Sequence, residues 1–197
     1  LGNEKRRIAC STAAGPAFEG AKIACGMRGA DGAIEHAHLV DGKLECKVIG
    51  GGRPTGICGS GLIDIIACLL DAGVIDESGK LLENPRVVQI DENTKKAYLL
   101  ADPLESGDGK PVYLSQKDIR EVQLAKGAIA AGIALLAEQM GITLEQVEQV
   151  YIAGAFGNYM DPAGACRIGM LPGVLKDRII PVGNAAGEGA KLALLNK

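Results

Sequence analysis

Residues 150–158 read Val-Tyr-Ile-Ala-Gly-Ala-Phe-Gly-Asn, an apolar run that stops abruptly at Gly154. An apolar run of this length, bounded by turn residues, predicts a strand buried within a sheet. The pattern recurs at residues 179–182, a second predicted strand, which Gly183 and Asn184 follow. Ligands of open α/β sheets bind beyond the carboxyl ends of the strands, so these two turns are the first candidates for a binding site.

The longest helix is predicted over residues 116–140. Ser115 and Asp118 stand at the spacing of a capping box, and Gly141 supplies a C-terminal stop. The small residues between positions 125 and 134 give this helix a thin flank, on which another stretch of backbone can lie closely.

Other helices are predicted from their caps and from their apolar pattern. Residues 62–72 are apolar on nearly every face of a helix, so this helix must lie between layers; the glycine-rich loop at residues 50–61 precedes it. Thr143, Asp161 and Asn184 stand where helix N-caps are expected, and a proline directly follows Asp161.

The N-terminal part of the chain is predicted to form strands. Short strands are expected at residues 7–10 and 21–25, followed by a hairpin that turns at residues 41–42. Residues 76–112 are more polar and suggest a hairpin-type insertion. The order of elements predicts an α/β fold in a single domain over residues 1–197, with a mixed sheet whose N-terminal strands are antiparallel and which helices cover.

Composition narrows the class of protein. The chain has 197 residues, 47% of them hydrophobic, a formal net charge of −3 and no long apolar segment, so we expect a cytoplasmic protein that binds neither nucleic acid nor membrane. None of the six cysteines forms a C-x-x-C pair, which argues against a zinc or iron–sulfur site and for reduced thiols.

The 28 glycines, about twice the average share, point to close backbone contacts of the kind found at phosphate and nucleotide sites. No P-loop and no G-x-G-x-x-G fingerprint is present. Each glycine-rich motif, taken alone, is also explained by a tight turn or by close helix packing. The two polar residues at positions 123 and 126 are also explained as part of a solvated helix face. Together they favour a nucleotide, with these candidate contacts: Gly59, Ser60, Gly61, Gln123, Lys126, Gly154, Ala155, Phe156, Gly157, Asn158, Gly183 and Asn184.

Acid–base chemistry is harder to find in the sequence. The two histidines, His36 and His38, lie on one predicted strand and complete no Ser-His-Asp or Cys-His set. Asp64 lies near the start of the apolar helix. The catalytic residues therefore stay unknown at this point.

Five stretches of the chain carry recognisable motifs: residues 9–20, 56–64, 118–128, 152–158 and 182–187. Together they resemble one family, the reductive activators of corrinoid proteins, which has them in the same order. The ATP-dependent module of these proteins belongs to the acetate and sugar kinase/Hsp70/actin superfamily (ASKHA). The resemblance implies an actin-like, ribonuclease H-like lobe, with nucleotide held between two lobes.

The resemblance also implies a function. Such activators use ATP, with Mg, to drive electron transfer from an iron–sulfur domain to an inactive cobalt(II) corrinoid protein of a methyl-transfer system. By position, residues 154–158 would be the adenosine motif and residues 183–189 the second connecting helix. Gln123 and Lys126 would flank the adenine.

Two family features are missing from these residues: the Asp-Ile-Gly-Thr phosphate motifs and the iron–sulfur domain. The chain therefore looks like most of the second lobe of a larger protein, with the cluster expected upstream. Two other interpretations stay open, a module that docks a corrinoid protein with a vestigial nucleotide site, and a small-molecule kinase of the same superfamily. The sequence also leaves a homodimer open.

Because the chain would supply only one side of the cleft, we predict that these 197 residues by themselves bind ATP weakly or not at all. A calorimetric titration of the isolated chain with ATP and Mg should give no saturation at micromolar concentrations. A micromolar affinity would contradict the assignment to one lobe.

Overall fold

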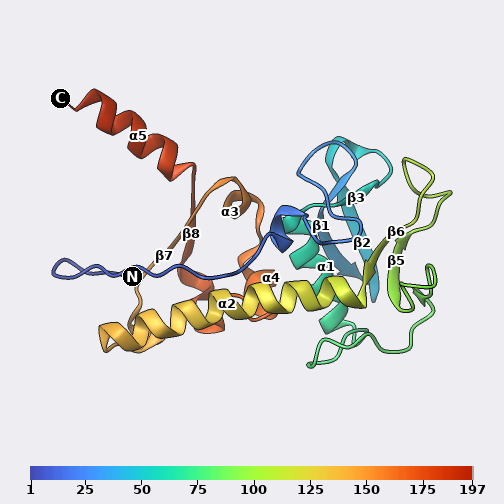
Figure 1. Cartoon of the computed structure of the whole chain (residues 1–197), viewed down its shortest axis with the longest axis horizontal. Helices are drawn as coiled ribbons and strands as arrows, with labels where there is room; N and C mark the ends of the chain where they lie inside the picture. Colours follow the sequence, from blue (N-terminus) through green and yellow to red (C-terminus); the bar gives the residue numbers. More distant parts are fainter. Residues whose placement is uncertain (197) are drawn as a thin grey trace.

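The computed structural model describes residues 1–196 (Figure 1). Its strands are β1 Ala33–Val40, β2 Lys43–Val48, β3 Gly56–Ile57, β4 Val87–Val88, β5 Ala97–Ala101, β6 Val112–Ser115, β7 Val150–Ala153 and β8 Ile179–Gly183. Its α-helices are α1 Gly59–Asp71, α2 Gln116–Met140, α3 Ala155–Tyr159, α4 Pro162–Arg167 and α5 Ala185–Leu195. Short 3₁₀ helices cover η1 Ala17–Glu19, η2 Ile49–Gly51, η3 Leu144–Gln146 and η4 Gly173–Arg178.

Helix α1 is the centre of the hydrophobic core. Ten of its thirteen residues are buried, among them Leu62, Ile63 and Leu69, each at most 1% exposed. One side of α1 packs on β1 and another on α4. The prediction that an apolar helix here must lie between layers is confirmed, because no face of it can be left in water.

The β1–β2 hairpin forms as predicted. Asp41 and Gly42 both have positive φ, 48° and 74°, as a type I′ turn requires. The inward residues of β2 are half-buried and alternate with exposed charged ones. Strand β3 pairs with β1 in parallel, so this sheet is mixed and its N-terminal pair is antiparallel, as predicted.

Three sequence predictions about the strands are wrong. Residues 7–10 and 21–25 form no strand: Arg7 makes only an isolated bridge with Gly2, and residues 21–25 lie in turns and a bend. In place of one sheet, the described residues form three, β2-β1-β3, β4-β5-β6 and β7-β8. Strand β7 is also less buried than predicted, with Tyr151 61% exposed, because within residues 1–196 it pairs with β8 alone.

The capping box of α2 joins the N-terminal segment to the long helix. Asp118 Oδ2 accepts hydrogen bonds from the Ser115 amide at 2.8 Å and from the Ser115 hydroxyl at 2.7 Å. Its Oδ1 accepts from the amide of Ala24, 94 residues away, at 2.9 Å. Gly141 ends α2 in the left-handed conformation, as predicted.

The N-terminal segment packs closely on the small residues of α2, as predicted. A Cβ at Gly132 would lie 2.5 Å from the Thr12 side chain, and Cys10 Sγ contacts the Gly132 carbonyl at 3.9 Å. The N-terminal segment therefore lies directly on the helix backbone. Among residues 1–196, none of the helices combines the length and the apolar character that crossing a membrane needs.

We predict that Asp118→Ala lowers the free energy of unfolding by about 2–4 kcal/mol, because it leaves the buried amide and hydroxyl of Ser115 without their acceptor and releases the amide of Ala24. Urea denaturation followed by circular dichroism measures this loss. The control is Glu138→Ala, an exposed carboxylate on the same helix, which should change stability by less than about 0.5 kcal/mol. Equal effects of the two variants would show that Asp118 does not hold the segment.

Candidate functional site

The two glycine turns meet at one edge of the molecule. Strands β7 and β8 are parallel neighbours, so their carboxyl ends lie side by side, and the Gly154 amide donates to the Gly183 carbonyl at 2.7 Å. Gly154 adopts φ 104° and ψ 162°, a region that only glycine occupies readily. Nothing lies within 4 Å of where a Cβ on Gly154 would be, so its backbone can be approached closely.

Two asparagines complete this edge. The Asn158 side chain lies beside Gly183, 3.4 Å from where a Cβ on that glycine would stand. Asn184 caps α5 by accepting from the Gly187 amide at 3.1 Å, as the sequence predicted. The structure therefore brings together Gly154, Asn158, Gly183 and Asn184 from the two strand ends.

The first turn of α1 is closed by packing. A Cβ on Gly59 would lie 2.1 Å from the Phe18 carbonyl oxygen, and one on Gly61 would lie 2.2 Å from that of Ile34. Ser60 is buried and donates its hydroxyl to the Glu35 carbonyl at 2.8 Å. These residues let the helix approach neighbouring backbone, and the space around them is filled by the protein itself.

Phe156 connects the α1 terminus with the strand-end turns. Its ring stacks on that of Phe18, with centroids 5.7 Å apart and planes 24° from parallel. The same ring would meet a Cβ on Gly59 at 2.7 Å. Gly157 is also tightly packed, since a Cβ there would lie 2.4 Å from the Ile152 side chain. Phe156 and Gly157 thus support the turn from inside.

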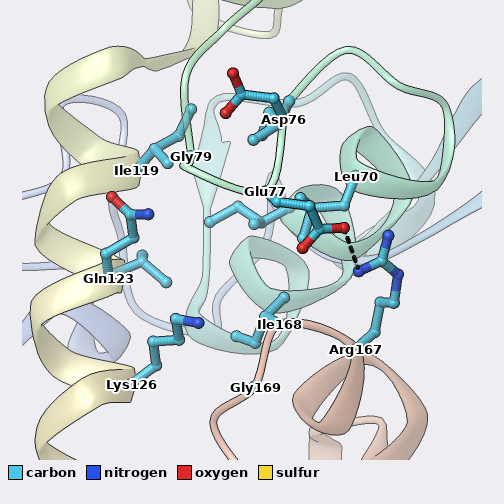
Figure 2. Close-up of a pocket in the computed structure, with 13 residues that line it drawn as sticks. Leu70, Asp76, Glu77, Gly79, Ile119, Gln123, Lys126, Arg167, Ile168 and Gly169 are labelled. Carbon is cyan, nitrogen blue, oxygen red and sulfur yellow. Dashed lines mark ion pairs between the residues drawn. The ribbon is translucent and has the colours of Figure 1, made fainter.

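Gln123 and Lys126 lie elsewhere, in a cavity of about 190 Å³ between α1, α2, the end of α4 and residues 75–79 (Figure 2). They share one face of α2, as predicted, and both line this cavity. None of the strand-end turn residues lines it. The structure therefore divides the predicted contacts into two places.

A pair of a half-buried histidine and a buried aspartate, which the sequence did not reveal, joins β1 to α1. His36 Nδ1 lies 2.9 Å from Asp64 Oδ2, and the Ala37 amide donates to the same oxygen at 3.4 Å. Asp64 Oδ1 is buried without a hydrogen-bond partner. Burial raises the pKa of the Asp64 carboxyl above its ordinary 3.8, and the hydrogen bonds from His36 and Ala37 only partly oppose this. The two residues are 28 positions apart, and no spacing rule links them.

Within residues 1–196 no three His, Cys, Asp or Glu side chains are grouped so that they could hold a metal ion. The six cysteines are free thiols distributed over the fold. The described residues therefore do not fit an iron–sulfur cluster.

Comparison with known proteins identifies the class. Residues 1–197 match the family model described as the C-terminal domain of RACo, the ASKHA domain. The chain belongs to this family, which confirms the α/β, actin-like fold class and the resemblance read from the sequence motifs.

Particular relatives agree with this assignment. The chain is 42% identical to corrinoid activation enzyme RamQ of Eubacterium limosum, over 100% of this chain and 35% of that protein. It is 31% identical to the [Co(II) methylated amine-specific corrinoid protein] reductase of Methanosarcina barkeri, over 98% and 36%. A solved structure, a reductive activator for corrinoid, iron-sulfur protein, superposes with a TM-score of 0.84 at 40% identity, over 95% of this chain and 30% of that chain. The chain thus spans about a third of the length of these relatives.

We predict that Asp64→Asn changes the pH dependence of stability. A raised pKa means that Asp64 favours the folded state below pH 3.8, and that this contribution is lost as the pH rises through the raised pKa. The unfolding free energy of the variant relative to the wild type should therefore increase as the pH rises from 3.8 through the raised pKa of Asp64. Urea titrations at several pH values measure it.

The control for that series is Asp41→Asn, which removes a carboxylate from the exposed hairpin turn. A difference between Asp64→Asn and the wild type that stays constant with pH would contradict the assigned direction.

Proposed function

We propose that the intact protein is an ATP-dependent reductive activator, which transfers an electron to a cobalt(II) corrinoid protein and returns it to cobalt(I). Membership of the family supports this, as do two relatives whose names describe the activation or reduction of corrinoid proteins. The iron–sulfur cluster that supplies the electron would lie in a part of the protein outside this chain. ATP with Mg would be held between this lobe and another part.

The observation that carries the nucleotide part is the pair of adjoining turns at the ends of β7 and β8. Gly154 adopts a backbone conformation that other residue types rarely adopt, and the space where a Cβ would stand is open. A ribose or phosphate can therefore reach the backbone amides of this turn. The asparagine amides at positions 158 and 184 add polar side chains at this edge. When bound, ATP supplies the free energy for an electron transfer that is unfavourable by itself.

The other candidate contacts support this proposal unequally. Gly59, Ser60 and Gly61 are covered by the protein's own backbone and by Phe156, so we assign them to packing that supports the turn. Ala155 and Gly157 complete the turn between Gly154 and Asn158. The cavity that holds Gln123 and Lys126 is separate from these turns, so we do not include that pair in the proposed nucleotide contact.

One observation favours the second candidate, a docking lobe with a vestigial nucleotide site. The amides at the start of α1, which a phosphate would use at a helix N-terminus, are enclosed by packing. No residue in the described structure favours a small-molecule kinase. A variant at the turn distinguishes the first two candidates.

We predict that Gly154→Ala in the intact protein abolishes the ATP stimulation of cobalt(II) reduction, because any side chain strains this turn and fills the space that the ligand would use. The reduction is followed by the change in corrinoid absorbance with and without ATP. The matched control is Gly73→Ala, which also places a side chain at positive φ (67°) in open space, but at the end of α1.

Thermal denaturation establishes that both variants fold. If Gly154→Ala folds and keeps full ATP stimulation, the turn is not a nucleotide contact and the docking interpretation is preferred. If the wild-type protein shows no effect of ATP at all, the activator proposal itself is wrong.

A further inference from the structure

The cavity beside α2 is separate from the turns at the ends of β7 and β8. It lies between Ile66 and Leu70 of α1, Ile119 and Val122 of α2, and Ile168 at the end of α4 (Figure 2). Its volume of about 190 Å³ is below the roughly 300–1,000 Å³ of pockets for drug-sized ligands. The cavity is therefore too small for a whole nucleotide and suits a smaller molecule.

The wall formed by residues 76–81 is held in place by side chains of α2. Gln116 donates to the Gly79 carbonyl at 2.7 Å and accepts from the Leu81 amide at 2.8 Å. Arg120 and Gln123 donate to the Ser78 carbonyl at 3.1 and 2.9 Å. These four hydrogen bonds fix the loop against the helix, so the cavity is formed before any ligand binds.

The polar groups that line the cavity are satisfied, with one exception. Arg167 pairs with Asp71 at 2.5 Å and Glu77 at 3.9 Å. Asp76 accepts from the amides of its own turn, at residues 78 and 80.

Gln123 is engaged at both ends, because its Oε1 also accepts from Arg120 at 2.7 Å. Lys126 makes no hydrogen bond or ion pair with any residue from 1 to 196. Its ammonium points into the cavity next to Gly169 and Ile168, as Figure 2 shows.

Placing a half-buried ammonium beside apolar side chains costs free energy unless an anion pairs with it. We propose that this cavity binds a small organic monoanion. Its carboxylate pairs with Lys126, and its apolar part packs on the isoleucine and leucine side chains that line the cavity. Arg167 already pairs with Asp71 and Glu77, and Asp76 is held by amides of its own turn, so Lys126 is the lining cation that has no partner among residues 1–196. This inference is independent of the proposed nucleotide contact.

The test uses the intact protein and butyrate as the probe, with butyramide as its neutral isostere. Equilibrium dialysis measures affinity, and the methyl NMR signals of Ile119 and Ile168 report where the probe binds. We expect butyrate to shift both signals and to bind about tenfold or more tightly than butyramide. Acetate should bind more weakly than butyrate, by about fourfold for each methylene removed.

Lys126→Met keeps the unbranched shape and most of the length of the side chain and removes its charge, so it should weaken butyrate binding about tenfold or more. The matched control is Lys117→Met, an exposed lysine on the same helix, which should leave the affinity unchanged. The proposal is overturned if butyrate leaves both methyl signals in place, if butyramide binds equally well, or if the two lysine variants act alike. It is also overturned if ATP shifts the same two methyl signals, since the cavity would then belong to the nucleotide site.

Discussion

The burial of α1 on all sides is the constraint on which the rest of this structure depends. An almost wholly apolar helix has no face to offer to water, so β1 and α4 must cover it. Its first turn can enter the core only because Gly59 and Gly61 carry no side chain where the carbonyls of Phe18 and Ile34 approach. The glycines that suggest a phosphate loop in the sequence are therefore needed first for packing.

This use of Gly59 and Gly61 changes where a nucleotide contact can be expected. At the strand ends, a Cβ on Gly154 would have open space around it, and one on Gly183 would meet only a side chain. The glycines in the first turn of α1 lie against backbone carbonyls. Phe156 links the two regions, because its ring covers Gly59 while its own backbone belongs to the turn.

The contact between His36 and the buried Asp64 is a second link between the sheet and α1. Asp64 has one oxygen bonded to β1 and one without a partner, so its ionised form is poorly stabilised. In contrast, Asp118 has both oxygens engaged and fixes the N-terminal segment to α2. Two buried aspartates in one fold thus act in different ways, because one is fully hydrogen-bonded and the other is not.

The sequence by itself determined the elements whose signals are local. The capping box at Ser115, the hairpin turn at residues 41–42 and the cap at Asn184 are all where it placed them, since each depends on neighbours within a few residues. Only the tertiary structure decided how distant segments meet. It separated Lys126 from the strand-end turns, paired His36 with Asp64, and left residues 7–10 without a partner strand, because these outcomes depend on contacts between segments far apart in the chain.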